Sequence, residues 1–376
     1  MVRILFCITY LILLIGCKEQ PPEKTQNKDY TNNFRQLNKS EKQAYRTKAI
    51  QIYHSLLGRN FSGGVLVAKN GEIIFEDYNG YKDFEQKKVL TENTPIHIAS
   101  VSKTFTAIAI LKLYEQGALQ LEDSVQKYFP SFPYSGITIQ HLLTHRSGLP
   151  NYLYFMDTAW NKNVYATNND VLQFMLQKHP AAYSLPNRGF HYCNTNFVLL
   201  ALIIEKITKK TYPDYLQETI FDALNMKNSF VFSIKDTAHY IPSYQYNNKP
   251  YQLESFDCVY GDKNVYSTVR DLLLWDQALY NNHFIKASTI QKAFTPYSFE
   301  KEGNKNYGLG WRLYIDGTDT VVYHGGWWHG NNSLLTRLIQ DTATIIAIGN
   351  KYNRGIYAIN QMASIFSTDK MGELEF

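Results

Sequence analysis

Ser100 and Lys103 are the residues of this sequence whose types and spacing best suit covalent chemistry. They stand three positions apart in the segment IASVSKTFTA, where an apolar run predicts a helix over residues 100–116. Residues with this spacing share one helix face, with Cβ atoms roughly 5–6 Å apart. A serine hydroxyl needs an adjacent base to act as a nucleophile, and burial favours the neutral form of an amine. The pair therefore suits nucleophilic catalysis by Ser100, with Lys103 as its proton partner.

The spacing by itself is weak, because an isolated Ser-x-x-Lys more often marks a helix cap. The same pattern recurs in polar or poorly patterned segments that begin at Ser124, Ser298 and Ser367. Only Ser100 opens a strongly apolar helix, and the unpaired N–H groups at a helix start favour developing negative charge.

A second group is Tyr192-Cys193-Asn194, which also opens an apolar helical run. A phenol beside a lysine ammonium is pushed toward phenolate and can act as a base. Asn194 carries both a donor and an acceptor, which suits it to position Lys103 and a substrate carbonyl. Tyr-x-Asn also occurs at Tyr30, Tyr246 and Tyr280, outside such a context.

The third group is His324-Gly325-Gly326-Trp327, the one His-x-Gly of the sequence, at the end of a predicted strand. Its glycines would let a substrate backbone approach closely. The N–H groups of an exposed strand there suit an oxyanion hole, which is often the largest single contribution to catalysis.

The elements that must bring these groups together lie far apart in the sequence. Residues 63–68 and 69–75 predict a hairpin around Asn70-Gly71, and strands return over 307–315, 320–324, 333–339 and 344–349. Helices are predicted over 196–209, 215–224, 268–280 and 357–366. We therefore expect an α/β (α+β) fold, with one antiparallel sheet built from both chain ends, flanked by helices, and an inserted, mainly helical lobe over about 118–300.

In this order, the three groups resemble the motifs of the serine β-lactamase and penicillin-recognising superfamily, in its class C-like branch with esterases and D-amino-acid peptidases. The stretches 139–150, 266–272 and 307–311 resemble further characteristic segments of this superfamily, so the resemblance spans about residues 45–366. It implies a β-lactamase/DD-peptidase-like fold and acylation of Ser100, with proton transfer shared between Lys103 and Tyr192. It also implies an oxyanion hole from the backbone N–H groups of Ser100 and Trp327, without metal or cofactor.

In this resemblance Asn194, His324, Gly325 and Gly326 would line and orient the substrate. Many β-lactamases carry a lysine where this sequence has His324, and a neutral histidine supplies no permanent charge for a substrate carboxylate. We therefore expect ester or peptide cleavage rather than efficient β-lactam hydrolysis. The alternative is a binding or sensing lipoprotein that acylates slowly or not at all.

Other nucleophiles and bases fit less well. A thiol nucleophile at Cys193 and catalytic roles for His145 or His191 are alternatives, but we expect these residues to be structural. An α/β-hydrolase would need G-x-S-x-G, which the sequence lacks. Cys193 and Cys258 leave one disulfide open as an option, and no Cys/His spacing suggests zinc.

The N-terminus predicts a lipoprotein. Residues 4–15 are apolar but too short to span a bilayer, and Leu14-Ile15-Gly16-Cys17 resembles a bacterial lipobox. We expect a signal peptide over 1–16, a lipid on Cys17 with a flexible tether over 17–40, and a hydrolase domain over 41–370. This predicts the bacterial cell envelope, and Lys18 after Cys17 indicates the outer membrane, or its periplasmic side, in a cell that has one. A net charge of +5 without a basic cluster argues against nucleic-acid binding. The resemblance implies a small-molecule or short-peptide substrate and leaves protein partners open.

Overall fold

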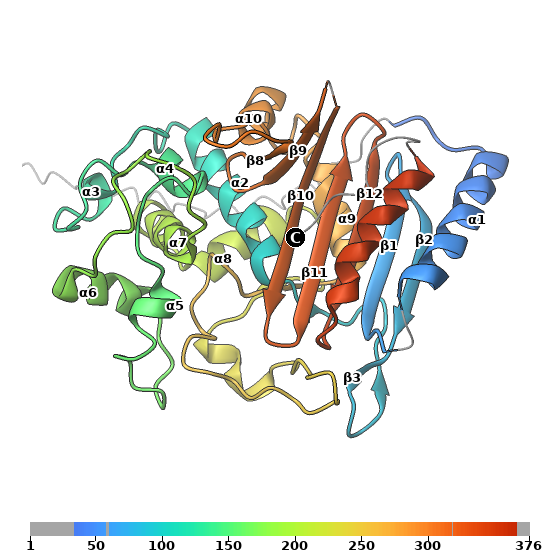
Figure 1. The fold of residues 1–376 in the computed structure, drawn as a ribbon, viewed down its shortest axis with the longest axis horizontal. Coiled ribbons are helices and arrows are strands. Elements are labelled where there is room, and N and C mark those ends of the chain that lie inside the picture. Colours follow the sequence, from blue (N-terminus) through green and yellow to red (C-terminus); the bar gives the residue numbers. More distant parts are fainter. Residues whose placement is uncertain (1–33, 58–59, 318, 367–376) are drawn as a thin grey trace, which may run out of the picture.

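A seven-stranded antiparallel sheet combines strands from the N-terminal and C-terminal parts of the chain (Figure 1). The computed structural model describes residues 34–57, 60–317 and 319–366, so the expected signal peptide and Cys17 lie outside the described residues. The strand order is β2-β1-β12-β11-β10-β9-β8. The strands are β1 (Gly63–Lys69), β2 (Glu72–Asn79), β8 (Lys305–Tyr307), β9 (Arg312–Asp316), β10 (Asp319–Trp328), β11 (Asn331–Leu338) and β12 (Ala343–Gly349). The expected sheet from both chain ends is confirmed.

The hairpin of β1 and β2 turns at Asn70 and Gly71, as the sequence predicts. Both residues have positive φ, 51° and 74°, which Asn and Gly adopt most readily. β1 in turn pairs with β12 from Gly63↔Gly349 to Lys69↔Ala343, so the first strand is held by the last one.

Helices cover both faces of the sheet. On one face lie α1 (Lys39–Leu56) and η4 (Arg354–Ile365), which pack on residues such as Val65, Val67 and Ile345. The alternate residues of the same strands, such as Leu66 and Ile346, face the second and larger core with α2 (Ser102–Glu115) and α9 (Val269–Ala278). This period of two is what a sheet buried on both sides requires.

The middle of the chain forms the mainly helical lobe, on the left in Figure 1. Its helices are α3 (Val125–Tyr128), α4 (Ile139–Leu143), α5 (Tyr152–Phe155), α6 (Asn168–Lys178), α7 (Asn194–Thr208), α8 (Tyr212–Leu216) and η2 (Gln217–Phe221). Next in sequence come η3 (Ile234–His239), α9 and α10 (Ala287–Ala293). Although α9 falls within the range expected for the lobe, it packs against β1 and β12.

Two small sheets complete the fold. β3 (Tyr81–Asp83) pairs with β4 (Lys88–Val89), and β5 (Ile96–His97) pairs with β7 (Val265–Ser267), which also pairs with β6 (Phe230–Val231). The β5-β7-β6 sheet matters for the site because β5 leads directly into the turn that carries Ser100.

Two strand predictions need correction. The strand expected over 307–315 is two strands, β8 and β9, because Gly310 has φ 82° and turns the chain tightly against α2. β10 runs four residues past His324, so the glycines of His324-Gly325-Gly326 lie within a strand rather than after one.

Candidate active site

Ser100 lies in η1 (Ala99–Val101), a single tight helical turn that continues into α2. α2 passes between the helical lobe and the sheet (Figure 1), and eleven of its residues are buried. A helix surrounded by apolar neighbours holds its first turn firmly, so Ser100 has a fixed place beside β10.

Lys103 is fully buried and makes three hydrogen bonds. Its Nζ lies 3.1 Å from Ser100 Oγ, 2.8 Å from Asn194 Oδ1 and 2.7 Å from the carbonyl oxygen of Asp262. The predicted proximity of Ser100, Lys103 and Asn194 is thus present, with Asn194 as the first residue of α7.

Tyr192 enters the same space from the segment before α7. Its ring centre lies 5.0 Å from Lys103 Nζ and 5.3 Å from the guanidinium carbon of Arg312, which is the first residue of β9. Both distances lie within the range of a cation–π contact, so the two cations help to hold the ring in place.

β10 forms the opposite wall. A Cβ atom on Gly326 would lie 2.6 Å from the carbonyl oxygen of Ile98 and 2.8 Å from the Ser100 nitrogen, so only glycine lets the strand approach the nucleophile this closely. β10 pairs with β9 only as far as Tyr323, so the part of β10 after this residue is not hydrogen-bonded to β9. Gly325, Gly326 and Trp327 follow at this edge, and the Trp327 side chain is 63% exposed.

His324 lies in this wall but faces inward and is fully buried. Its Nδ1 lies 2.8 Å from the Gly325 carbonyl oxygen, and its Nε2 lies 3.2 Å from the Tyr307 hydroxyl. Burial, with Arg312 and Lys103 nearby, lowers the pKa of His324 well below its ordinary value. His324 is therefore neutral, and both its nitrogens are occupied by the protein, so it shapes the strand rather than presenting a charge.

His145 and His191 occupy supporting positions. His145 is fully buried, and its Nδ1 accepts hydrogen bonds from the Cys193 backbone N–H at 3.1 Å and from Asn196 Nδ2 at 3.2 Å. Its ring packs 4.2 Å from the Tyr192 ring, and burial, with Lys103 nearby, lowers the pKa of His145 well below its ordinary value. The ring of His191 stacks on Tyr183 at 3.7 Å, away from this contact.

Cys193 and Cys258 are both free and buried. Burial raises the pKa of Cys193 to about 11, which keeps it a thiol rather than a nucleophilic thiolate at neutral pH. In the part of the chain that the structure describes, no group of three or more His, Cys, Asp or Glu side chains is placed to hold a metal ion.

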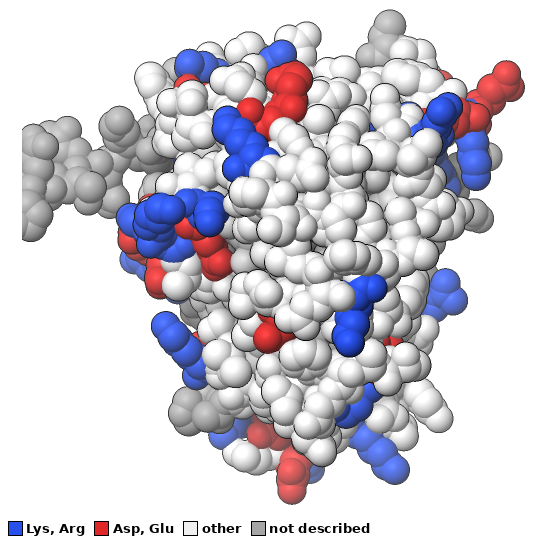
Figure 2. Space-filling model, turned by 90° about the vertical axis from the view of Figure 1, so that its left-hand side faces the viewer, with Lys and Arg blue, Asp and Glu red and all other residues white. Residues whose placement is uncertain are grey.

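The surface and the helices bear on possible partners. Figure 2 shows positive and negative side chains dispersed around a broad uncharged area, without a continuous basic patch on the described part of that face. No helix within residues 34–57, 60–317 and 319–366 has the length and apolar character to span a bilayer.

Three contributors to the site have little signal in the sequence. Arg312 is a single arginine on a strand, outside any motif. Tyr307 belongs to the segment 307–311, whose residue types indicate no chemical role. Asp262 contributes its backbone carbonyl to Lys103, a contact that depends on the path of the chain and not on the residue type.

Comparisons with known proteins agree with this geometry. The Beta-lactamase family model matches residues 45–355. Penicillin-binding protein 4* of Bacillus subtilis (strain 168) is 35% identical over 323 residues, covering 81% of this chain and 72% of that protein. Protein flp of Staphylococcus aureus (strain MW2) is 29% identical over 332 residues, which cover 83% of this chain but only 62% of Protein flp.

Solved structures share the fold. The penicillin binding protein from Bacillus halodurans superimposes with a TM-score of 0.73 and 26% identity, covering 84% of this chain and 98% of the other. The D-amino acid amidase from Ochrobactrum anthropi SV3, complexed with L-phenylalanine amide, has a TM-score of 0.69 and 23% identity, over 86% of this chain and 97% of the other. With a matching family model over most of its length, this chain belongs to the beta-lactamase family and is a serine hydrolase of that family.

Proposed function

We propose that the protein forms an acyl-enzyme at Ser100 and cleaves an ester or amide bond in a small molecule or short peptide. The observation that carries this proposal is the set of three contacts made by Lys103 Nζ, to Ser100 Oγ, Asn194 Oδ1 and the Asp262 carbonyl oxygen. An ammonium donates all three of these bonds. A neutral amine donates two and accepts the proton of the Ser100 hydroxyl, so the same geometry serves both protonation states.

In the first half-reaction Ser100 Oγ forms a bond to the substrate carbonyl carbon. Its proton passes to the base shared by Lys103 and Tyr192 and then to the departing alcohol or amine. The carbonyl oxygen becomes negative and accepts hydrogen bonds from the N–H groups of Ser100 and Trp327. Water then attacks the Ser100 ester, and the same groups return its proton to Ser100 Oγ, which releases the acid.

The side chains around Ser100 favour esters and peptides over β-lactams. His324 is neutral and fully engaged within the protein, so it offers no charge to a substrate carboxylate. A D-amino-acid bond is a further candidate, supported by the D-amino acid amidase among proteins of similar fold.

A substrate panel of p-nitrophenyl esters, D-amino-acid amides and nitrocefin tests this proposal. We expect esters or amides to be turned over faster than nitrocefin, with an acyl adduct on Ser100 detected by intact mass. Faster hydrolysis of nitrocefin would reverse the substrate order. A lack of labelling by both a fluorophosphonate and a penicillin would instead support the binding or sensing lipoprotein.

We also propose that a lipid on Cys17 anchors the protein in the bacterial cell envelope. The support is the apolar run before Leu14-Ile15-Gly16-Cys17 and the polar segment after it. Cys17→Ser expressed in a bacterium should lose incorporation of labelled palmitate and move from the membrane to the soluble fraction. Equal membrane retention of both forms, without palmitate in either, would contradict the anchor.

A further inference from the structure

The residue before the nucleophile has an unusual backbone conformation. Ala99 has φ 46°, in the left-handed region that residues with a Cβ atom adopt at a cost of about 1–2 kcal/mol. Such a conformation persists only where the surrounding structure enforces it, and strained residues of this kind concentrate at functional sites. The conformation of Ala99 sets the direction in which the chain enters Ser100.

The peptide unit between Ile98 and Ala99 is held on both of its sides. Its carbonyl oxygen accepts a 2.6 Å hydrogen bond from Ser333 Oγ on β11, and its N–H donates to His97 Nδ1 at 3.2 Å. Because a peptide unit is planar, two bonds on opposite sides fix its orientation. Of the two partners, His97 binds the Ala99 nitrogen itself, and it thereby helps to fix the peptide plane from which φ of Ala99 is measured.

His97 is in turn held in one tautomer. Nδ1 accepts from Ala99, so the ring proton is on Nε2, which donates to Asn264 Oδ1 at 3.1 Å. The amide nitrogen of Asn264 donates to the backbone carbonyl oxygen of Asp257 at 2.6 Å. His97 is 3% exposed, and its ring meets the Tyr266 ring edge-on at 5.1 Å.

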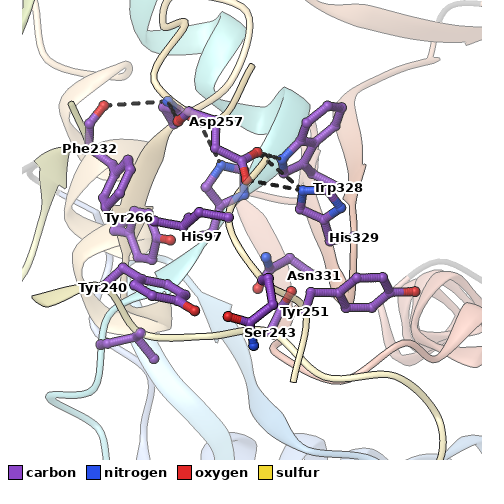
Figure 3. Close-up of a pocket in the computed structure, with 14 residues that line it drawn as sticks. His97, Phe232, Tyr240, Ser243, Tyr251, Asp257, Tyr266, Trp328, His329 and Asn331 are labelled. Atoms are coloured by element: carbon purple, nitrogen blue, oxygen red, sulfur yellow. Dashed lines mark hydrogen bonds and ion pairs between the residues drawn. The ribbon is translucent and has the colours of Figure 1, made fainter. Parts of the chain in front are cut away.

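Figure 3 shows His97 among the residues that line a small pocket. Asp257 lies nearby and accepts a hydrogen bond from Trp328 Nε1 at 2.7 Å, while His329 Nε2 lies 3.1 Å from the same carboxylate. Trp328 follows Trp327 on β10, so the support of His97 and the proposed oxyanion strand meet in one cluster.

We propose that His97 is a positioning residue for Ser100, and that its Nδ1 holds the Ala99 amide so that the Ser100 hydroxyl and N–H keep their orientation toward Lys103 and β10. This inference rests on the proposed acylation of Ser100. His97 does not touch substrate; it acts through the backbone of Ala99.

Protonation of His97 would remove this support, because a protonated Nδ1 faces the Ala99 N–H with a second N–H. Burial lowers the pKa of His97 to about 4, against smaller opposing effects of Asn264 and Asp257. Acylation should therefore fall reversibly as the pH falls through about 4. The titratable groups around His97 are Asp257 and Lys263 from the loop before β7, Tyr266 on β7, Tyr240 on the pocket wall, and His329 after β10.

Three variants separate positioning from general stability. His97→Phe keeps a ring of similar size but has no acceptor, whereas His97→Asn places an amide oxygen near the position of Nδ1. In the double variant His97→Phe/Ala99→Gly, glycine adopts positive φ without the cost that alanine has, so the chain no longer needs the hydrogen bond. Tyr240→Phe, on the same pocket wall, is the matched control.

The readouts are the fluorophosphonate acylation rate at Ser100 and kcat and KM for a p-nitrophenyl ester. Loss of a single oxyanion donor costs ~100-fold or more, so a misdirected Ser100 N–H in His97→Phe should lower kcat ~10-fold or more, with little change in KM. We expect His97→Asn and the double variant to recover most of this loss, and Tyr240→Phe to match the wild type. His97→Phe that acylates at the wild-type rate, or a loss that Ala99→Gly does not relieve, would overturn the inference.

Hydrogen exchange at the Ala99 amide provides a test that does not depend on catalysis. We expect faster exchange in His97→Phe than in the wild type, with melting temperatures recorded for both. If the wild type is not acylated at all, the proposed function fails, and the exchange rates alone decide the role of His97. Equal exchange in the two proteins would reject that role.

Discussion

The guanidinium carbon of Arg312 lies 5.3 Å from the ring centre of Tyr192, on a strand that is 120 residues away in sequence. Lys103 Nζ lies 5.0 Å from the same ring centre. Two cationic side chains therefore lie over the ring of Tyr192, both within the roughly 6 Å range of a cation–π contact. These contacts hold the Tyr192 ring beside Lys103, where the proposed mechanism gives its hydroxyl a share of proton transfer.

Arg312→Gln should slow ester hydrolysis near pH 7 because the Tyr192 ring loses one of the two cations that pack on it and is positioned less firmly. We expect ~10-fold lower kcat with little change in KM, because a misplaced proton-transfer group slows the chemical step. The matched control is Lys305→Gln, which removes an exposed positive charge from the neighbouring strand β8. An unchanged kcat in Arg312→Gln would show that this arginine does not position Tyr192.

Gly326→Ala should separate β10 from the nucleophile. The added Cβ atom would lie 2.8 Å from the Ser100 nitrogen and 2.6 Å from the Ile98 carbonyl oxygen, both of which are backbone atoms. We expect kcat to fall ~100-fold, as when an oxyanion donor is lost, while the protein stays folded. At Gly189 a Cβ atom meets nothing within 4 Å, so Gly189→Ala should keep full activity. Similar rates for the two variants would exclude close approach of β10 as a requirement.

Buried neutral histidines should make the fold acid-sensitive. The pKa of His97 falls from an ordinary 6.5 to about 4 on folding. As the pH falls, the unfolded chain therefore becomes protonated at His97 before the folded chain does, and this favours unfolding. Its contribution to stability is complete above pH ~6.5 and is lost as the pH falls toward ~4, by roughly 2 kcal/mol at pH ~5. His97→Asn lacks this titration, so urea unfolding at pH ~7.5 and ~5 should show a smaller acid loss in the variant. Identical losses in both proteins would contradict a buried neutral His97.

The Cys193 thiol should be dispensable for acylation. It is fully buried with a pKa raised by burial to about 11, and its Sγ lies 3.5 Å from the Pro150 carbonyl oxygen. Cys193→Ala should keep the fluorophosphonate label, with a stability loss of ~1–2 kcal/mol from the small cavity. Loss of label in Cys193→Ala, with retention in Ser100→Ala, would identify the thiol as the nucleophile.

The sheet and the three motifs are predictable because they depend on local patterns. Asn70-Gly71 specifies a tight turn, the apolar run after Lys103 specifies a buried helix, and alternating or continuous apolar runs specify the terminal strands. The division of residues 307–315 into β8 and β9 is harder to predict from the sequence. It depends on Gly310 fitting beneath Ala107, where its Cβ would approach to 2.4 Å, a contact between distant parts of the chain.

The supporting residues are harder to infer from sequence for the same reason. Asp262 reaches Lys103 through its backbone oxygen, and Arg312 reaches Tyr192 through space. His97 lies only three residues before Ser100. Its proposed role, however, depends on the left-handed backbone conformation of Ala99, which no pattern of residue types predicts. Tertiary contacts of this kind become visible only when the chain is folded.

Intact-mass analysis of the wild type and of Ser100→Ala after exposure to a fluorophosphonate tests the central claim most directly. We predict one added phosphonyl group on the wild type, located at Ser100 by peptide mapping. We predict none on Ser100→Ala, whose melting temperature should equal that of the wild type and so show that it is folded. Equal labelling of both proteins, or a label mapped to another residue, would contradict Ser100 as the nucleophile.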